Sequence, residues 1–574
     1  GLVERTRARA DGGDHDDRPT DLQRLVEAIV DADRADGVPA QPHPWLDPLP
    51  EHLDLATLRP PTLRGPAPTE LRALIGLVDL PERQAQDGWV VDLGAIGHLL
   101  VYGASGAGKT TVLRNLVVAL AANLGPTDLH VYGLDFASRG LIPLAALPHC
   151  GGVVTADDPE RVERLVTLLE RIVRERRVRI GDAGASSLSE YRAAGHRLPY
   201  VVVLIDGYGA LYSTYLSVDH GELLDRMGRL VAEGRSVGVH LVITADRRGA
   251  IPTALSSVVP GRLVLRMGDS DEYASLGLPT ALGNTTIPAG RGFVDGGREV
   301  QLAVLGADAS GAGFQAALGD FAARVRSTVP HGAPGLPVPV QSFSDAITVD
   351  DLSLAARPAA TDTLSVAFGM SGASDSVAYV DLGDVGTFAV FGPDRSGRTN
   401  ALAVVASALM TANPTMEAYL LAPRRTRLTA LPGWTEAAAG SDACDELARR
   451  LADMASTRQG EAPTPWLVVI DDGDELADTG GSTALAALLR RGRDCGLILV
   501  AAAQTHTVHR SFGGWLTDLR KAKHAMMLVP DLELDGELVG ARLPKKSSRR
   551  FPTGRGYLVR RGDVDYVQVA LLDR

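Results

Sequence analysis

The stretch "VVDLGAIGHLLVYGASGAGKTTVL" (residues 90–113) decides the fold of this chain. Within it, "GASGAGKT" (103–110) is a complete phosphate-binding loop of the form G-x-x-x-x-G-K-[ST]. The apolar run before the loop predicts a β-strand, and the apolar periodicity after it predicts a helix. In that setting backbone N–H groups and a helix N-terminus converge on a β-phosphate, Lys109 bridges the β- and γ-phosphates, and Thr110 ligates magnesium. The stretch therefore predicts a nucleoside triphosphate site.

The same stretch occurs a second time further along the chain. "YVDLGDVGTFAVFGPDRSGRTNAL" (379–402) aligns with it without a gap. Two later stretches repeat in the same order: "GRSVGVHLVITADR" (234–247) matches "GRDCGLILVAAAQT" (492–505), and "PAGRGFV" (288–294) matches "PTGRGYLV" (552–559). A shared order of shared motifs indicates a duplicated module.

The organisation of the chain follows from this repeat. A segment rich in Pro and Gly, 325–343, predicts a linker, and we place the module boundary near residue 328. Short continuous apolar runs alternate with helix-period stretches, which predicts an α/β fold of two tandem P-loop NTPase modules, each a mostly parallel sheet flanked by helices. The predicted division is a disordered tail over 1–20, a first module with the complete loop over 21–328, whose opening amphipathic helix packs on that module, and a second module with a degenerate loop over 329–574.

Composition narrows the class of protein. The chain has 574 residues, of which 45% are hydrophobic and 22% charged, as in ordinary globular proteins. Its formal net charge of −12 disfavours a chain whose main task is to grip a nucleic-acid backbone. Three cysteines without a C-x-x-C pair predict neither a disulfide framework nor a zinc site, which favours a reducing cytosol. We find no apolar run of about 20 residues, the length that spans a bilayer.

A carboxylate for the magnesium shell follows the apolar run "VVVLI" in the first module. It is Asp206, the residue that ends this predicted strand. The next position, where a fast ATPase of this type carries an acid that orients the attacking water, is Gly207. We therefore expect slow hydrolysis or tight retention of ATP.

The second module keeps the acids but not the loop. Asp471 takes the magnesium position and Asp472 the position of Gly207, whereas Arg398 replaces the loop lysine. The planar guanidinium is longer than an ammonium and is not expected to enter the lysine's nest in the same way. Asp394 inside the loop would also repel a phosphate. Weak or absent nucleotide is the prediction here, and a triphosphate held without efficient turnover is the alternative.

The predicted site residues form three sets. Catalytic roles are predicted for Lys109, Asp206, Asp471 and Asp472. Nucleotide contacts are predicted for Gly103, Ala104, Ser105, Gly106, Ala107, Gly108, Lys109, Thr110 and Thr111 in the first module, and for Gly392, Gly397, Arg398 and Thr399 in the second. Magnesium ligands are predicted to be Thr110, Asp206 and Thr399.

The motifs "GASGAGKTT", "VLIDGYGAL", "GRSVGVHLVITADR" and "PAGRGFV", in this order, resemble the FtsK/SpoIIIE ATPases. Two tandem modules with "IDGYG" and then "IDDGD", preceded by "HPWLDPLPEHLDLATL", resemble the second and third ATPase modules of the EccC family of type VII (ESX) secretion ATPases of actinobacteria. The resemblance covers nearly the whole chain from about residue 21. Family members carry membrane helices and a first ATPase module ahead of these two, so we expect either a fragment or the cytosolic subunit of a split system.

The resemblance implies RecA-like modules that use ATP and Mg²⁺. It implies assembly, as a hexamer, at the inner face of the cell membrane through a membrane-anchored ATPase module or the rest of the same chain. It also implies recognition of a small helical WXG100-type substrate by the last module. The strand "PGRLVLRMGD" resembles the FtsK strand with a neighbour-facing arginine, here Arg262, whose counterpart in the second module is expected at His524.

Two other functions stay open at this stage. One is an FtsK-like translocase on double-stranded DNA, which the net charge opposes, as does the chain ending one strand past the repeat without a DNA-reading domain. Its only support is the basic cluster "PKKSSRR" (544–550), and such clusters are usually solvated. The other is a non-hydrolysing docking module in which ATP is a structural ligand.

Overall fold

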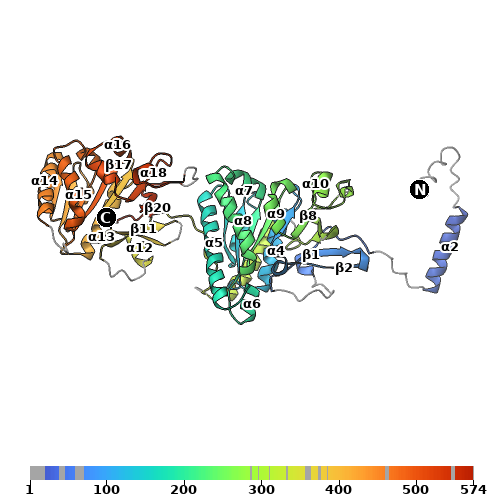
Figure 1. Ribbon diagram of the computed structural model, residues 1–574. Helices are drawn as coiled ribbons and strands as arrows, with labels where there is room; N and C mark the ends of the chain where they lie inside the picture. Colours follow the sequence, from blue (N-terminus) through green and yellow to red (C-terminus); the bar gives the residue numbers. More distant parts are fainter. Residues whose placement is uncertain are drawn as a thin grey trace.

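The chain folds into two α/β modules that follow one another in sequence (Figure 1). The computed structural model describes residues 20–37, 46–58, 70–284, 287–294, 296–308, 310–330, 334–355, 363–372, 376–383, 385–458, 464–544 and 550–572. The predicted tail over 1–20 lies almost wholly outside these residues.

The first module is built on a ten-stranded sheet with the order β2-β1-β10-β9-β8-β3-β7-β6-β4-β5. The six strands from β8 to β5 are parallel, and the remaining pairs are antiparallel. Its strands are β1 (Arg72–Leu80), β2 (Ala85–Asp92), β3 (Leu99–Tyr102), β4 (Leu129–Asp135), β5 (Cys150–Thr155), β6 (Tyr200–Asp206), β7 (Val239–Ala245), β8 (Gly261–Leu265), β9 (Arg291–Val294) and β10 (Arg298–Leu302).

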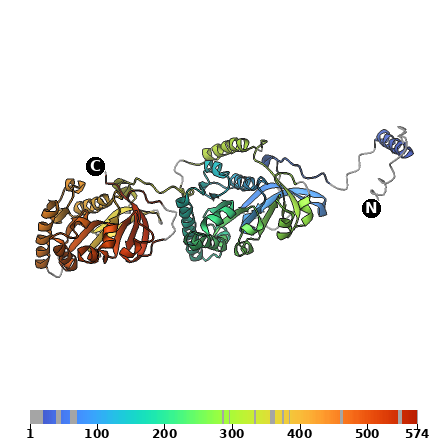
Figure 2. The ribbon, with the colours of Figure 1, turned by 90° about the horizontal axis from the view of Figure 1, so that it is seen from above.

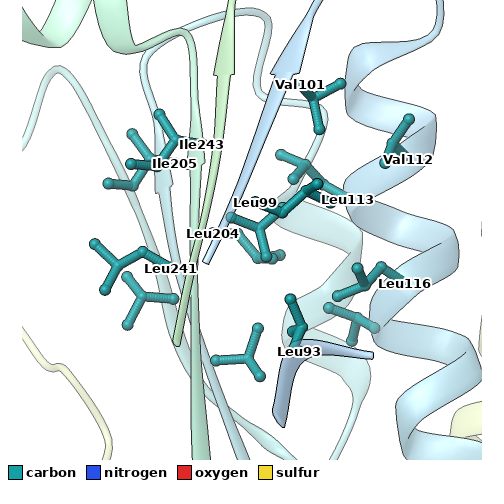
Figure 3. Close-up of a cluster of buried hydrophobic side chains, with 14 of the residues drawn as sticks. Leu93, Leu99, Val101, Val112, Leu113, Leu116, Leu204, Ile205, Leu241 and Ile243 are labelled. Carbon is teal, nitrogen blue, oxygen red and sulfur yellow. The ribbon is translucent and has the colours of Figure 1, made fainter. Parts of the chain in front are cut away.

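The central strands are apolar along their whole length because helices cover both faces of the sheet. Every residue of β4, β6 and β7 is buried. Leu113 and Leu116 of the helix after the loop pack toward Leu99 and Val101 of β3, beside side chains of β6 and β7 (Figure 3). The helices are α3 (Leu93–Ile96), α4 (Lys109–Asn123), α5 (Pro159–Asp182), α6 (Leu188–Ala193), α7 (Tyr208–Tyr215), α8 (Glu222–Gly234), α9 (Thr253–Val258), α10 (Ser270–Ser275) and α11 (Gly311–Thr328).

The second module repeats this sheet position by position, in the order β12-β11-β20-β19-β18-β13-β17-β16-β14-β15. Alternate residues of its central strands enter two apolar clusters, one on each face. Its elements are α12 (Val349–Ala355), β11 (Ser365–Ser371), β12 (Val377–Asp381), β13 (Thr387–Gly392), α13 (Arg398–Ala412), β14 (Ala418–Ala422), β15 (Glu436–Ala439), α14 (Ser441–Thr457), β16 (Trp466–Ile470), α15 (Ser482–Arg491), β17 (Leu497–Gln504), α16 (Thr505–Arg510), α17 (Gly514–Arg520), β18 (His524–Leu528), α18 (Gly536–Val539), β19 (Arg555–Arg560) and β20 (Asp563–Val569).

The predicted fold class is confirmed. Two sheets, each with a parallel half that carries the loop, are flanked by helices as the sequence indicated. The antiparallel half of each sheet was not predicted, because its strands are partly exposed and lack the continuous apolar runs of the parallel strands.

One expectation about packing is wrong. The predicted helix forms as α2 (Asp21–Asp36), capped by Thr20, but none of its residues is buried. It lies apart from the first module in both views (Figures 1 and 2). In the described parts of the chain, no helix is both long and apolar enough to cross a bilayer.

Candidate functional site

The first loop, residues 103–110, connects the end of β3 to the start of α4. Gly106 and Gly108 have φ values of 73° and 107°, in the left-handed region that favours glycine. Gly103 is packed tightly, because a Cβ there would lie 3.0 Å from Leu265 Cβ. The loop therefore needs its glycines to bring backbone N–H groups together at the N-terminus of a 15-residue helix, which is the setting that binds phosphate.

Lys109 folds back over this loop. Its Nζ donates hydrogen bonds to the carbonyl oxygens of Gly103 at 2.6 Å and Ala104 at 3.0 Å. Burial lowers the pKa of Lys109 below its ordinary value, and the carboxylates of Asp206 and Asp246 oppose that shift. The ammonium is thus held at the loop by carbonyls that a phosphate oxygen can replace.

Thr110 and Asp206 meet as the sequence predicted. Thr110 Oγ1 donates to Asp206 Oδ2 at 2.6 Å, and Thr244 Oγ1 donates to Asp206 Oδ1 at 2.7 Å. Asp206 is fully buried. A hydroxyl and a carboxylate side by side at the end of a phosphate loop are oxygen donors of the type that Mg²⁺ prefers.

Sequence reasoning missed Thr244, which lies in β7 between the loop strand and β6. Its hydroxyl also accepts the N–H of Gly207 at 2.9 Å, so one side chain orients both the acid and the residue after it. The sequence repeat could have drawn attention to Thr244, because it is a polar residue in an apolar strand and the aligned residue of the second module is Ala502.

The backbone explains why residue 207 is glycine. Gly207 has φ 84°, and a Cβ there would lie 3.1 Å from the carbonyl carbon and oxygen of Phe136. An acidic residue at this position is strained and crowded against the loop after β4. The first site thus combines an intact phosphate loop with a missing water-orienting acid.

In the second module, Arg398 occupies the place of Lys109 more closely than expected. Its Nη1 donates to the carbonyl oxygens of Gly392 at 2.6 Å and Pro393 at 2.9 Å, the counterparts of the two carbonyls that Lys109 contacts. The longer side chain does enter the nest. The fork leaves Nη2 free to pair with Asp472 at 3.0 Å, and Asp394 lies 3.7 Å away.

The rest of this second loop is also changed. Arg395 stands where the first loop has Gly106, with φ 60°, a conformation that costs a non-glycine residue about 1 kcal/mol. Asp394 is largely exposed and accepts a hydrogen bond from Gln504 Nε2 at 2.7 Å. The Asp394 carboxylate is therefore satisfied by a neighbour in the same module.

The magnesium position of the second module repeats the threonine–aspartate contact of the first module and adds a second threonine. Asp471 accepts hydrogen bonds from Thr399 Oγ1 at 3.1 Å and from Thr426 Oγ1 at 2.7 Å. Burial raises the pKa of Asp471 above its ordinary value, and the neighbouring carboxylate of Asp472 adds to the shift. All the predicted acids and hydroxyls of this module come together: Thr399 pairs with Asp471 as Thr110 does with Asp206, and Asp472 pairs with Arg398.

The second loop also touches the repeated "GRG" motif. The N–H of Gly554 donates to the carbonyl of Ser396 at 2.8 Å. The next residue, Arg555, is buried and reaches Glu160 of the first module, Nη1 to Oε2, at 3.4 Å. The same arginine donates to the carbonyl of Phe343 in the linker at 3.1 Å.

The predicted neighbour-facing arginine lies away from both loops. Arg262 pairs with Leu100 near the start of β3, at the sheet edge opposite the phosphate loop. In the second module the residue aligned with Leu100 is Ala389, and it pairs with Ala525 rather than with His524. The expected counterpart was therefore wrong by one residue.

A phosphate loop between a parallel strand and a helix, with an acid at the end of the next strand but one, occurs twice in this chain. The fold and the sites define a tandem P-loop NTPase. Residues 62–289 match the FtsK/SpoIIIE family, so the first module carries an FtsK/SpoIIIE domain.

The chain is homologous to EccC proteins of type VII secretion. It is 29% identical over 588 aligned residues to the ESX-4 secretion system protein EccC4 of Mycobacterium tuberculosis, an alignment that covers 96% of this chain and 44% of EccC4. The chain thus spans less than half the length of this curated relative.

Two solved structures share the whole architecture. Thermomonospora curvata EccC (ATPases 2 and 3) in complex with a signal sequence peptide matches with a TM-score of 0.71 and 25% identity, over 92% of this chain and 97% of that one. The cytoplasmic domain of the same EccC matches with a TM-score of 0.73 and 24% identity, over 92% of this chain and 64% of that one. The two modules correspond to ATPases 2 and 3.

Proposed function

We propose that this chain is an ATP-binding component of a type VII secretion motor, with ATP·Mg²⁺ bound only by the first module. The observation that carries the proposal is the difference between the partners of the two loop cations. Lys109 is held by carbonyls alone, whereas Arg398 is held by the same kind of carbonyls and by Asp472.

In the first site, residues of this chain provide the groups that a nucleotide needs. The N–H groups around Gly106 and Gly108 and the ammonium of Lys109 would hold the phosphates of a nucleotide. Thr110 and Asp206 would hold the magnesium ion that accompanies it. Bound magnesium neutralises phosphate charge and polarises the phosphoryl oxygens.

Hydrolysis at this site is proposed to be slow. Gly207 supplies no carboxylate to orient the attacking water, and the backbone there does not accept one easily. Thr244 fixes Asp206 and the Gly207 N–H, so the site is ordered for binding. A bound nucleotide of long lifetime suits a regulatory role more than a fast power stroke.

The second module is proposed to recognise the exported substrate. The relative of the same two-module architecture was solved with a signal sequence peptide, and a module without its own nucleotide is suited to docking. The substrate class is a small helical protein of the WXG100 type. The chain is proposed to work in the cytoplasm at the membrane, joined to a membrane-anchored ATPase module, and to assemble as a hexamer.

The test is the stoichiometry of ATP·Mg²⁺ binding, measured by calorimetry on this chain and on the Lys109→Ala variant. One nucleotide per chain, lost in Lys109→Ala, is expected. Arg398→Ala is the matched control, and its stoichiometry is expected to stay at one. Two nucleotides per chain, with one surviving Lys109→Ala, would overturn the proposal for the second module.

A DNA translocase is the function to exclude experimentally. The basic cluster 544–550 falls mostly outside the described residues, and the net charge of the chain is −12. We expect no salt-dependent binding of a DNA duplex at 50 to 200 mM salt, roughly the range over which phosphate contacts lose most affinity. Duplex binding with a steep salt slope would favour the translocase.

A further inference from the structure

A groove with a volume of about 760 Å³ lies on the second module, at the end of the sheet opposite the phosphate loop. It is lined at the start of β13 by Thr387, at the start of β17 by Leu497 and at the start of β18 by His524. These three strands are parallel, so the loop that follows β13 lies at their other end. The volume lies within the roughly 300–1,000 Å³ of pockets that hold a ligand.

Four cationic side chains line this groove. Arg490 comes from the end of α15, Lys521 and Lys523 follow α17, and Arg561 lies at the turn between β19 and β20. Lys521 pairs with Asp518 at 2.7 Å. The ammonium of Lys523 is exposed and has no partner among the residues that the structure describes.

The groove has an excess of positive charge. Its only carboxylates among the described lining residues are Asp494 and Asp518, so four cations face two anions. The chain as a whole has the opposite sign, with a formal net charge of −12. A cleft lined mainly by one sign of charge attracts ligands of the other sign. We call this cleft the basic groove.

The first module does not have these cations. The repeat aligns Gly492 with Gly234, and strand pairing aligns Ala525 of β18 with Arg262 of β8. Three of the four cations then align with uncharged residues: Arg490 with Ala232, Lys521 with Val258 and Lys523 with Pro260.

The fourth cation lies in a hairpin that is longer in the second module. Arg555 and its partner Gln568 are 13 residues apart, whereas the equivalent Arg291 and Gln301 are 10 residues apart. Arg561 lies at the tip of the longer hairpin, next to the pair Arg560 and Asp563. The excess of cations is therefore specific to the second module and is not part of the shared fold.

Stabilisation of helix ends does not explain these cations. A basic residue in the last turn of a helix complements the helix dipole. However, α8 and α9 of the first module have no basic residue in their last turns, whereas α15 ends with Arg490 and Arg491, and α17 ends with Arg520. The same helices thus form without them, which indicates a ligand as the reason for the cations.

The composition of the basic groove favours a peptide over a nucleic acid. Val385, Leu489 and Leu497 add apolar surface between the cations. The carboxylates of Asp494 and Asp518 would repel a phosphate backbone, but they can accept N–H groups of a peptide. A fitting ligand has carboxylates for the cations, N–H donors for the two acids and apolar side chains for the remaining surface.

We propose that the basic groove binds an acidic peptide segment of a partner protein, in which Asp or Glu side chains are interspersed with apolar ones. Arg490, Lys521 and Lys523 bind the carboxylates of that segment. The proposal goes beyond the function proposed above and depends neither on nucleotide binding nor on recognition of an exported substrate.

The direct test is fluorescence anisotropy with the 574-residue chain and a fluorescein-labelled peptide of three Glu-Glu-Leu repeats. Saturable binding is expected, weaker at high salt because exposed charge pairs are screened, and equal with and without ATP·Mg²⁺. An oligothymidylate with the same number of charges is expected to bind at least about tenfold more weakly. No saturable binding of the peptide, or tighter binding of the oligothymidylate, would overturn the proposal.

Two matched variants locate the binding. Lys521→Glu with Lys523→Glu reverses two cations of the basic groove and is expected to weaken peptide binding by at least about tenfold. Arg449→Glu with Arg510→Glu makes the same change in net charge at exposed positions of α14 and α16, and less than about a twofold change is expected. Equal weakening in both variants would show that the peptide responds to net charge alone, against the proposal.

A selection experiment tests the chemistry without a chosen peptide sequence. A random peptide library displayed on phage is depleted on the Lys521→Glu, Lys523→Glu variant and then selected on the parent chain. If that variant does not fold, Lys521→Gln with Lys523→Gln takes its place. Selected peptides are expected to have an excess of Asp and Glu, and a selection that yields no such excess would contradict the proposed class of ligand.

Discussion

The two phosphate loops of this chain differ in what the cation at the loop is paired with. Lys109 touches only carbonyl oxygens, so a phosphate can take it over without breaking an ion pair. Arg398 reaches the corresponding carbonyls and is neutralised by Asp472. The second loop therefore retains its positive charge, but that charge is already paired inside the module.

The largest change in nucleotide affinity is expected when the two loop cations are exchanged. Lys109→Arg is expected to weaken ATP·Mg²⁺ binding by about 100-fold or more, because a guanidinium fork does not replace a compact ammonium in the loop. Arg398→Lys is expected to add no second nucleotide, because Asp394, Arg395 and Asp472 remain. Calorimetry measures both, and a gain of a second site in Arg398→Lys would contradict the comparison.

The first module is expected to unfold at a higher pH than the second when the solution is acidified. Burial lowers the pKa of His98, His130 and His240 from 6.5 to about 4, and all three lie in the first module. The unfolded chain takes up these protons near pH 6.5 and the folded module only near pH 4. The stability they contribute is therefore complete above pH 6.5 and is lost as pH falls toward 4, by about 1–3 kcal/mol for each histidine.

Tryptophan fluorescence checks this prediction. Trp466 and Trp515 are fully buried in the second module, so emission reports on that module once Trp45 and Trp89 are replaced by Phe. Far-UV circular dichroism is expected to fall at a higher pH than the tryptophan signal. Loss of both signals at one pH would show that the modules unfold as a unit.

Removing the hydroxyl of Thr244 is expected to have a smaller effect. Thr244→Val removes the hydrogen bonds that its hydroxyl makes with Asp206 Oδ1 and with the Gly207 N–H, at a cost of about 1–3 kcal/mol in the free energy of unfolding, and Asp206 keeps its bond from Thr110. Magnesium-dependent ATP binding is expected to weaken as well. Thr244→Ser keeps the hydroxyl and is expected to restore both, and a failure of this rescue would mean that the methyl group matters more than the hydrogen bonds.

The smallest effect concerns the residue after the magnesium acid. Gly207→Asp is expected to lower the free energy of unfolding by about 1 kcal/mol, because φ 84° is unfavourable for a residue with a Cβ. The turnover of ATP is expected to stay low. Gly207→Ala carries the same Cβ without the acid, so a rise in turnover in Gly207→Asp alone would show that the missing acid is the sole defect of the site.

Much of this comparison was predictable from the sequence, because motifs read along one strand and one loop need no tertiary information. The duplication, both loops, Asp206 and Asp471 all lie where the motifs placed them. The length of a guanidinium also indicated that Arg398 differs from a lysine. That it reaches the carbonyls and Asp472 together depends on the distance between α13 and β16, which no local pattern gives.

Other features depend on contacts distant in sequence. Thr244 lies 38 residues from Asp206 and is recognisable only as a polar residue in a buried strand. The packing of α2 was predicted wrongly because periodicity shows that a helix has an apolar face but not which surface covers it.

The contact between Ser396 and Gly554 is the first link in a series of contacts from the second loop to the first module. One peptide step beyond Gly554, Arg555 reaches Glu160 of the first module, and Glu160 also accepts the N–H of Phe343 at 3.1 Å. Two hydrogen bonds and one ion pair thus connect the second loop to the start of α5 in the first module. The second loop is therefore a structural joint between the two modules as well as a former phosphate loop in sequence.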